Sequence, residues 1–122
     1  MASEINLPVY GDHRGKLTVV EKILPFSIKR VYYIYSCNSE SRGGHRHKKT
    51  IQALICIVGS CIVDWNNGSM SGTSVLDSPT KVLLVQPEDF HIMRDFSTDA
   101  VLLVLASEYF DPNDYIDEDY SR

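Results

Sequence analysis

Hydrophobic residues in this chain gather in short runs rich in β-branched and aromatic side chains, separated by polar turn residues. This pattern is typical of β-strands. Strands are expected over the ranges Lys16–Leu24, Ile28–Tyr35, Ile51–Val58, Ser60–Trp65, Thr73–Leu76, Val82–Gln86, His91–Asp95 and Ala100–Ala106. No long stretch shows the period of an amphipathic helix. Many short strands at this spacing predict an all-β sandwich or barrel.

Two of these runs, Ile51–Val58 and Ala100–Ala106, are apolar at successive positions rather than at alternate ones. Neighbouring side chains of a strand point to opposite faces of the sheet, so both faces of these strands are expected to be covered. We therefore expect inner strands, with a second subunit over the face that the chain itself leaves open. Near the C-terminus, Pro112-Asn113-Asp114 predicts a short helical turn.

The length and the charge of the chain narrow the range of partners. Its 122 residues suit one domain, placed here at residues 1–122. The formal net charge is −4, and an acidic protein does not attract nucleic acid or an anionic membrane surface over long range. The chain shows neither a secretory signal pattern nor an apolar run long enough to span a membrane. We expect a cytoplasmic protein that binds neither nucleic acid nor membrane.

The positive charges are unevenly distributed, since nine of the twelve Lys and Arg residues lie within residues 1–50. A small anionic ligand could therefore find a local cationic pocket on an acidic protein. Solvated surface cations are the alternative explanation for many of these side chains.

The candidate chemistry lies in the segment Arg42-Gly43-Gly44-His45-Arg46-His47-Lys48-Lys49. In an extended segment His45 and His47 point to the same face, so both imidazoles can reach one cavity. The glycines before them allow a sharp turn and a close approach of ligand to backbone. A pair of structural histidines at the end of a strand is the alternative interpretation.

The residues that follow the histidine pair resemble the two signature motifs of the cupin superfamily. The first motif has a His-x-His pair, an acidic residue and a glycine, and the second has a proline shortly before a third histidine. Gln52 stands at the acidic position, Gly59 at the glycine, and Pro87 and His91 in the second motif. The resemblance implies a single cupin barrel, a double-stranded β-helix or jelly roll.

Metal binding and acid–base chemistry are the two uses open to these histidines. Three histidines with a carboxylate would suit Fe, Mn, Zn or Ni. Here the Gln52 amide replaces the carboxylate, while Arg46, Lys48 and Lys49 add positive charge, and both changes disfavour a dication. We therefore expect no metal and no other cofactor. Histidines with a pKa near ~6.5 are natural proton-transfer groups at neutral pH.

Longer blocks of the chain resemble the dTDP-4-keto-6-deoxyglucose 3,4-ketoisomerases, from about residue 10 to about residue 117. These blocks are Asp12-x-Arg14-Gly15-x-Leu17, Pro25-Phe26-x-Ile28-Lys29-Arg30-Val31-Tyr32-Tyr33, Arg42-Gly43-x-His45-x-His47-Lys48, Asp95-Phe96-Ser97 and Asp114-Tyr115-Ile116. Two positions depart from the family pattern. Arg46 stands where members usually have alanine, and Phe90 stands where they usually have tryptophan.

The resemblance implies a metal-free isomerase, usually a homodimer, that moves a keto group from carbon 4 to carbon 3 of a dTDP-linked 6-deoxyhexose. Its products would feed amino-sugar synthesis for surface polysaccharides or natural products. His47 would be the base at carbon 3, and His45 would relay a proton or stabilise the oxyanion. The expected substrate-binding residues are Arg14, Arg30, Arg42 and Lys48 for the diphosphate, Tyr33 and Tyr35 for stacking, and His91.

Tyr32 alternates with Tyr33 and Tyr35 along the expected strand, so we expect it in the core or at an interface. Two other functions stay open at this stage. One is a metal-dependent cupin enzyme, such as a dioxygenase or a phosphosugar isomerase. The other is a non-catalytic module that binds nucleotide sugars, or a subunit partnered with a transferase.

Overall fold

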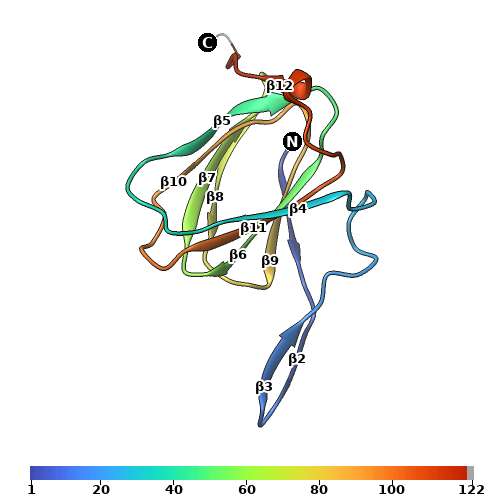
Figure 1. Cartoon of the computed structure of the whole chain (residues 1–122), viewed down its shortest axis with the longest axis vertical. Helices are drawn as coiled ribbons and strands as arrows, with labels where there is room; N and C mark the ends of the chain where they lie inside the picture. The colour runs from blue at the N-terminus through green and yellow to red at the C-terminus, as the bar shows by residue number, and fades with distance from the viewer. Residues whose placement is uncertain (121–122) are drawn as a thin grey trace.

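Strands form nearly all of the regular structure in the computed structural model, which describes residues 1–120 (Figure 1). The strands are β1 (Ser3–Asn6), β2 (Val9–Asp12), β3 (Gly15–Thr18), β4 (Arg30–Ile34), β5 (Arg42–His47), β6 (Gln52–Val58), β7 (Cys61–Asn66), β8 (Ser71–Leu76), β9 (Lys81–Val85), β10 (Phe90–Arg94), β11 (Val101–Ala106) and β12 (Tyr115–Ile116). Within residues 1–120 the only helical element is the 3-10 turn η1 (Pro112–Asp114). The predicted all-β class and the C-terminal helical turn are confirmed.

The first sheet has the strand order β1-β9-β6-β11-β4, and each neighbouring pair is antiparallel. The apolar runs of β6 and β11 lie side by side inside it, as their sequences predict. Leu54 pairs with Val104, and both side chains are buried between the sheets. Ile55 and Leu105 belong to a second apolar cluster on the other face of this sheet.

The second sheet has the order β12-β5-β10-β7-β8. In its registers His91 of β10 lies opposite His45 of β5, and Tyr115 of β12 lies opposite His47. The register between β10 and β5 shifts after His91, which marks a β-bulge. Residues far apart in the sequence therefore meet at one end of this sheet.

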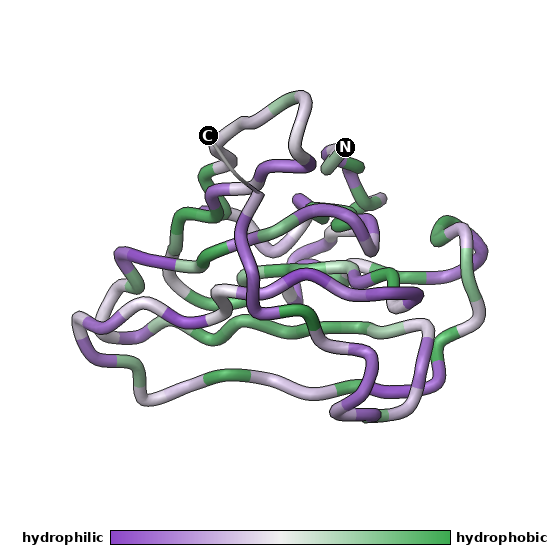
Figure 2. The backbone as a smooth tube through the Cα atoms, turned by 90° about the horizontal axis from the view of Figure 1, so that it is seen from above, coloured by the Kyte–Doolittle hydropathy of each residue, from purple (hydrophilic) through white to green (hydrophobic). Residues whose placement is uncertain are grey.

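The main core fills the space between the two sheets. Burial of these apolar side chains is the dominant stabilising contribution to the barrel. Figure 2 shows long hydrophobic stretches along the strands and hydrophilic residues at many of the turns. The largest members of this cluster are Leu54, Val63, Trp65, Leu76, Leu83, Val85, Met93, Leu102 and Val104.

The segment between β3 and β4 covers part of the outer face of the first sheet. Val20, Ile23, Leu24 and Phe26 pack against the second apolar cluster there. The prediction of a strand over Lys16–Leu24 is therefore wrong beyond Thr18, where β3 ends. The apolar side chains after Thr18 are buried because their segment packs against the outer face of the first sheet, without pairing as a strand.

Strands β1, β2, β5 and β12 were not predicted from the sequence. Strand β5 contains two successive glycines, Gly43 and Gly44, with φ angles of +86° and +79°, so its sequence resembles a turn. The β2–β3 hairpin stands away from the barrel (Figure 1). Within residues 1–120, no helix has the length and apolar character needed to cross a membrane.

Candidate active site

Strands β5 and β10 bring three histidines together. Strand alternation points His45 and His47 to the inside of the barrel and Arg46 to the outside. Gly43 allows the close pairing with β10, because a Cβ at this residue would lie 2.9 Å from the carbonyl oxygen of His91. The local sequence therefore sets both the spacing of the histidines and the approach of the strands that hold them.

The three imidazoles form one cluster with Tyr115. The ring centroids of His45 lie 5.1 Å from His47 and 5.2 Å from His91, and His47 and His91 are 6.3 Å apart. The Tyr115 ring lies 4.8 Å from that of His45 and 4.6 Å from that of His47. The predicted histidine pair is thus part of a larger aromatic cluster that strand β12 completes.

Asp114 is a site residue that the sequence indicates only as a member of a family block. Its Oδ2 lies 3.0 Å from Nδ1 of His47, and both side chains are buried. The same carboxylate accepts hydrogen bonds from the Lys49 amide at 2.9 Å and from the Thr50 hydroxyl. Because a carboxylate only accepts, Nδ1 of His47 carries a proton and Nε2 of the neutral ring is a base.

The Nε2 atom of His47 has no hydrogen-bond partner among residues 1–120, although it is fully buried. Burial of an imidazole nitrogen without a partner costs free energy, and such groups often have a functional role. A substrate proton is one partner that this atom could accept.

A cavity of about 300 Å³ lies beside the histidines, between the two sheets. His47 contacts two of its lining rings, those of His45 and Tyr115. The polar side chains that point into the cavity are Arg30, Tyr32, Arg42, His45, Gln52, His91 and Tyr115.

Tyr32 lies on the cavity side of β4, where its hydroxyl accepts a hydrogen bond from Gln52 Nε2 at 3.0 Å. Its own O–H is therefore available to donate to a ligand. The Arg30 guanidinium lies 4.4 Å from the Tyr32 ring centroid. Gln52 is 2% exposed, and its Oε1 has no partner among the described residues. Gln52 stands at the position where metal-binding cupins have a carboxylate ligand. Its side-chain amide orients the Tyr32 hydroxyl instead.

Tyr33 and Tyr35 extend from the outer face of β4 and of the residues that follow it, although Tyr33 also borders the cavity. They are 61% and 63% exposed, with ring centroids 5.9 Å apart. The expectation that these two rings stack on the substrate stays a prediction, and of the two only Tyr33 borders the cavity of its own chain. Tyr32 lies on the inner face of β4 together with Arg30, and both line the cavity.

The cationic residues expected at the site divide into two groups. Arg30 and Arg42 line the cavity. Lys48 is exposed beside His47, and its backbone amide donates to the Asp114 carbonyl at 2.9 Å. Arg14 lies on the β2–β3 hairpin, where its side chain is 79% exposed and paired with Asp12. Within its own chain, Arg14 therefore lies away from the cavity.

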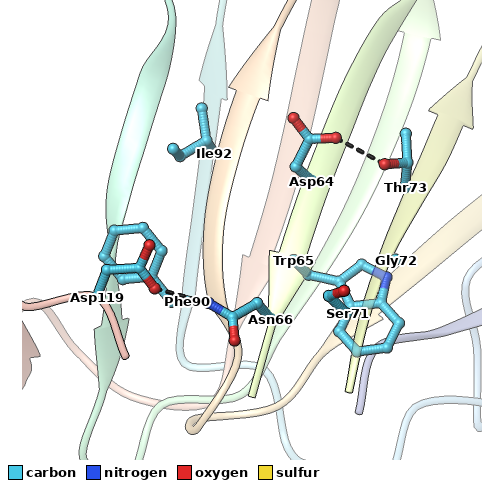
Figure 3. Close-up of a pocket in the computed structure, with 9 residues that line it drawn as sticks. All are labelled: Asp64, Trp65, Asn66, Ser71, Gly72, Thr73, Phe90, Ile92 and Asp119. Carbon is cyan, nitrogen blue, oxygen red and sulfur yellow. Dashed lines mark hydrogen bonds between the residues drawn. The ribbon is translucent and has the colours of Figure 1, made fainter. Parts of the chain in front are cut away.

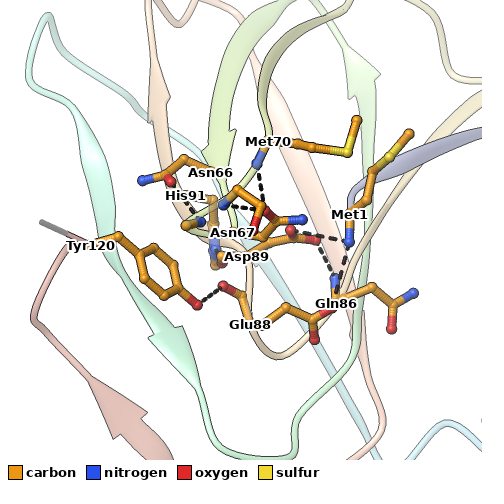
Figure 4. Close-up of polar contacts among 11 residues, drawn as sticks. Met1, Asn66, Asn67, Met70, Gln86, Glu88, Asp89, His91 and Tyr120 are labelled. Carbon is orange, nitrogen blue, oxygen red and sulfur yellow. Dashed lines mark hydrogen bonds and ion pairs between the residues drawn. The ribbon is translucent and has the colours of Figure 1, made fainter. Parts of the chain in front are cut away.

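Burial lowers the pKa of each clustered histidine. For His45 the main cause is desolvation, followed by the charge of His47. For His47 desolvation also dominates, and the hydrogen bond to Asp114 partly opposes it. Desolvation lowers the pKa of His91 to about 4, although its Nδ1 donates to the Asp89 carbonyl at 3.1 Å (Figure 4). Burial therefore favours the neutral form of all three histidines. Within residues 1–120, no group of three His, Cys, Asp or Glu side chains is arranged to hold a metal ion.

A second hollow, of about 260 Å³, lies on the outer face of the second sheet (Figure 3). Phe90, Asn66 and Asp119 line it, together with Asp64, whose carboxylate accepts a hydrogen bond from Thr73. It lies on the opposite face of the sheet from the histidine cluster.

Comparisons with known proteins point to one family. The chain matches the model described as "FdtA: WxcM-like, C-terminal" over residues 2–122. It is 49% identical over 115 residues to the TDP-4-oxo-6-deoxy-alpha-D-glucose-3,4-oxoisomerase of Aneurinibacillus thermoaerophilus, covering 92% of this chain and 83% of that protein.

Two solved structures extend this likeness to the fold. A 3,4-ketoisomerase from Helicobacter canadensis matches with a TM-score of 0.92 and 38% identity, covering 96% of this chain and 90% of that one. A variant of the 3,4-ketoisomerase QdtA from Thermoanaerobacterium thermosaccharolyticum, solved with TDP-4-keto-6-deoxyglucose, has a TM-score of 0.91 and 40% identity, covering 96% and 87% of the two chains. The barrel that the cupin resemblance implies is confirmed.

Proposed function

Because this chain belongs to the FdtA (WxcM-like, C-terminal) family, we propose how its own residues carry out the reaction of that family. The chain is an isomerase, a sugar 3,4-ketoisomerase that acts on a TDP-linked 4-keto-6-deoxyhexose. The keto group moves from carbon 4 to carbon 3, so the substrate and the product have the same atoms and no oxidant or reductant is consumed.

The reaction requires two proton transfers on carbon. The carbonyl at carbon 4 acidifies the hydrogen on carbon 3, and its removal by a base gives an enediolate. Return of a proton to carbon 4, with transfer of the hydroxyl proton from oxygen 3 to oxygen 4, produces the 3-keto sugar. A base with a pKa near or below neutrality, and donors that stabilise the enediolate, are therefore the groups that the site must supply.

His47 is the base in this proposal. The observation that carries it is the buried Nε2 without a partner, with Nδ1 held by Asp114 at 3.0 Å. Asp114 keeps the ring in the reactive tautomer and stabilises the imidazolium that forms when the ring takes the proton. His45, which lines the cavity and contacts His47, then relays a proton to carbon 4.

Neutral and cationic donors around the cavity stabilise the negative charge of the enediolate and of the diphosphate. The Tyr32 hydroxyl faces the reacting part of the sugar as a donor in this assignment. The neutral His91 ring, whose Nδ1 proton is bonded to the Asp89 carbonyl, can accept from a sugar hydroxyl through Nε2. Arg30 and Arg42 bind the diphosphate, because a guanidinium fork matches phosphate oxygens. Lys48 adds an exposed positive charge next to the site.

We propose that the enzyme is a homodimer. The outer face of the first sheet exposes large apolar side chains, among them Val31 at 56% and Tyr33 at 61%, and the β2–β3 hairpin exposes Tyr10 at 63%. A second copy of the chain that covers this face would bury them. In such a dimer, Arg14 of the hairpin would bind the diphosphate in the cavity of the second copy.

We place this activity in the cytoplasm, because a nucleotide sugar is a charged diphosphate that does not cross membranes unaided. The 3-keto product has a carbonyl suited to reductive amination. A transaminase that forms a 3-amino sugar for polysaccharide synthesis is therefore the class of enzyme that would use it.

The His47→Asn variant tests the proposed base. We expect kcat to fall by about 10²–10⁴-fold, the usual contribution of a general base, with the affinity for TDP roughly unchanged. Exchange of solvent deuterium into carbon 3 of TDP-4-keto-6-deoxyglucose, followed by NMR, measures the step directly. Wild-type turnover by His47→Asn would disprove the mechanism. TDP binding without exchange by the wild-type protein would indicate a binding module instead.

A further inference from the structure

Residues 117–120, called the strap below, cross the outer face of the second sheet. The Asp119 carboxylate accepts a hydrogen bond from Asn66 Nδ2 at 2.6 Å (Figure 3). The Tyr120 hydroxyl donates to the Glu88 carbonyl at 2.6 Å (Figure 4). These bonds attach the strap to β7 and to the loop before β10.

Arg46 provides a third attachment, from the strand that carries the histidines. Its Nε donates to the Glu118 carbonyl at 3.2 Å. Its guanidinium carbon lies 4.1 Å from the centroid of the Tyr120 ring, within range of a cation–π interaction. His45 and His47 point inward on either side of it, so β5 holds the site on one face and the strap on the other.

The strap follows β12 directly in the chain. β12 pairs with β5 through only two residues, Tyr115 opposite His47 and Ile116 opposite Arg46. A strand this short at the edge of a sheet has little stability of its own, so its position depends on how the chain is held on each side. On one side it is held by Asp114, bonded to His47, and on the other by the strap.

We propose that Arg46 is a positioning residue for the isomerisation. By holding the strap it keeps β12 on β5, and thereby keeps Tyr115 and Asp114 against His45 and His47. The proposal rests on the role of His47 as the base. Arg46, which points outward between His45 and His47, thereby has a function in the reaction without touching the substrate.

The other attachments of the strap allow this role to be tested without unfolding the barrel. The bonds of Asp119 to Asn66 and of Tyr120 to Glu88 do not involve Arg46. In Arg46→Ala we therefore expect a folded protein with a loosened β12. Amide hydrogen exchange at Ile116, which pairs with Arg46 on β5, should accelerate by about tenfold or more, because exchange reports local opening.

Kinetics and NMR of the same variant test the consequence for the reaction. We expect kcat to fall by about tenfold with little change in KM, because misplacement of catalytic groups affects the transition state more than substrate binding. The downfield Nδ1 proton resonance of His47 should broaden as its bond to Asp114 opens. Arg46→Lys, which keeps the charge but not the planar fork, should restore part of kcat.

Tyr120→Leu is the second variant, and it removes the other half of the Arg46 contact. Tyr120→Leu also removes the bond to Glu88, so the double variant should lose more kcat than Arg46→Ala. If both residues act through the strap, it should still lose less than the product of the two single losses, since their shared contact is removed only once. Lys81→Ala is the control, because Lys81 pairs with Glu4 and Asp77 at the first sheet. It should leave kcat and the exchange at Ile116 unchanged.

Wild-type kcat in Arg46→Ala, or a lower kcat with unchanged exchange at Ile116, would overturn the positioning role. So would additive effects of the two strap variants. If His47→Asn abolishes turnover while Arg46→Ala does not reduce it, the inference about Arg46 fails and the proposed function stands. Full turnover by His47→Asn removes the proposed function, whatever Arg46→Ala shows.

Discussion

Individual side chains in this site derive their properties from burial and from one or two hydrogen bonds each. His47 is 4% exposed and His91 is 1% exposed, so the protein interior favours their neutral forms. Asp114 opposes this effect at His47 alone, because its carboxylate bonds to Nδ1. In the proposed mechanism the same residue type therefore serves as a base at one position and as a neutral hydrogen-bonding group at the other.

The lowered pKa values predict how the rate depends on pH. A base must be unprotonated to act, so kcat/KM should be level above neutrality and should fall as pH drops through the pKa of His47. Because that pKa lies below its ordinary value, the acid limb should lie below pH ~6.5. Rates measured from about pH 4.5 to about pH 8.5, where circular dichroism shows a folded protein, check this. An acid limb with an apparent pKa above ~6.5 would contradict the burial of the base.

At the scale of the element, β5 is positioned by its glycines as much as by its hydrogen bonds. Gly43 and Gly44 both have positive φ angles, which a residue with a side chain rarely adopts. Only Gly43 also packs closely on the backbone of β10, where a Cβ atom would lie 2.9 Å from the His91 carbonyl oxygen. The contact between His45 and His91 thus depends on a glycine at position 43, because a Cβ atom there would push β5 away from β10.

Substitution of these two glycines separates backbone strain from close approach. Gly44→Ala should cost about 1–2 kcal/mol of unfolding free energy through its φ angle alone, since a Cβ there meets no atom within 4 Å. Gly43→Ala should cost more and should also lower kcat, because β5 must move away from β10. Urea denaturation and steady-state kinetics measure both. Equal effects of the two variants would show that the close approach is unimportant.

At the scale of the whole molecule, the barrel buries one face of its first sheet only in part. Residues between β3 and β4 cover some of the outer apolar cluster, and the outer side of β4 stays exposed with Val31, Tyr33 and Tyr35. The hairpin β2–β3 extends away from the barrel with its own apolar side chains exposed. Exposed apolar patches of this kind mark interaction surfaces.

The proposed homodimer predicts a change of mass after a single substitution on this face. The wild-type protein should sediment as a dimer, and Tyr33→Lys should shift it toward the monomer, because a buried ammonium without a partner is costly. Val75→Lys is the matched control, since Val75 is 47% exposed on β8 of the other sheet. A monomeric wild-type protein, or equal dissociation of both variants, would contradict the assigned interface.

Local patterns in the sequence were sufficient for the class of fold and for the histidine pair. Apolar runs such as those of β6 and β11 must be buried wherever the chain places them, and strand alternation alone puts His45 and His47 on one face. The motif order around Gln52 and His91 was enough to indicate a cupin barrel and, with the longer blocks, a ketoisomerase family.

Contacts between distant residues decided the rest. Asp114 lies 67 positions from His47, and no periodicity predicts their hydrogen bond. The inward orientation of Tyr32, opposite to that of Tyr33 and Tyr35, depends on which face of β4 turns toward the second sheet when β4 pairs with β11, and this is set only when the sheet forms. Sequence alternation thus determined which side chains share a face, whereas only the packed barrel determined which face is inside and what completes the site.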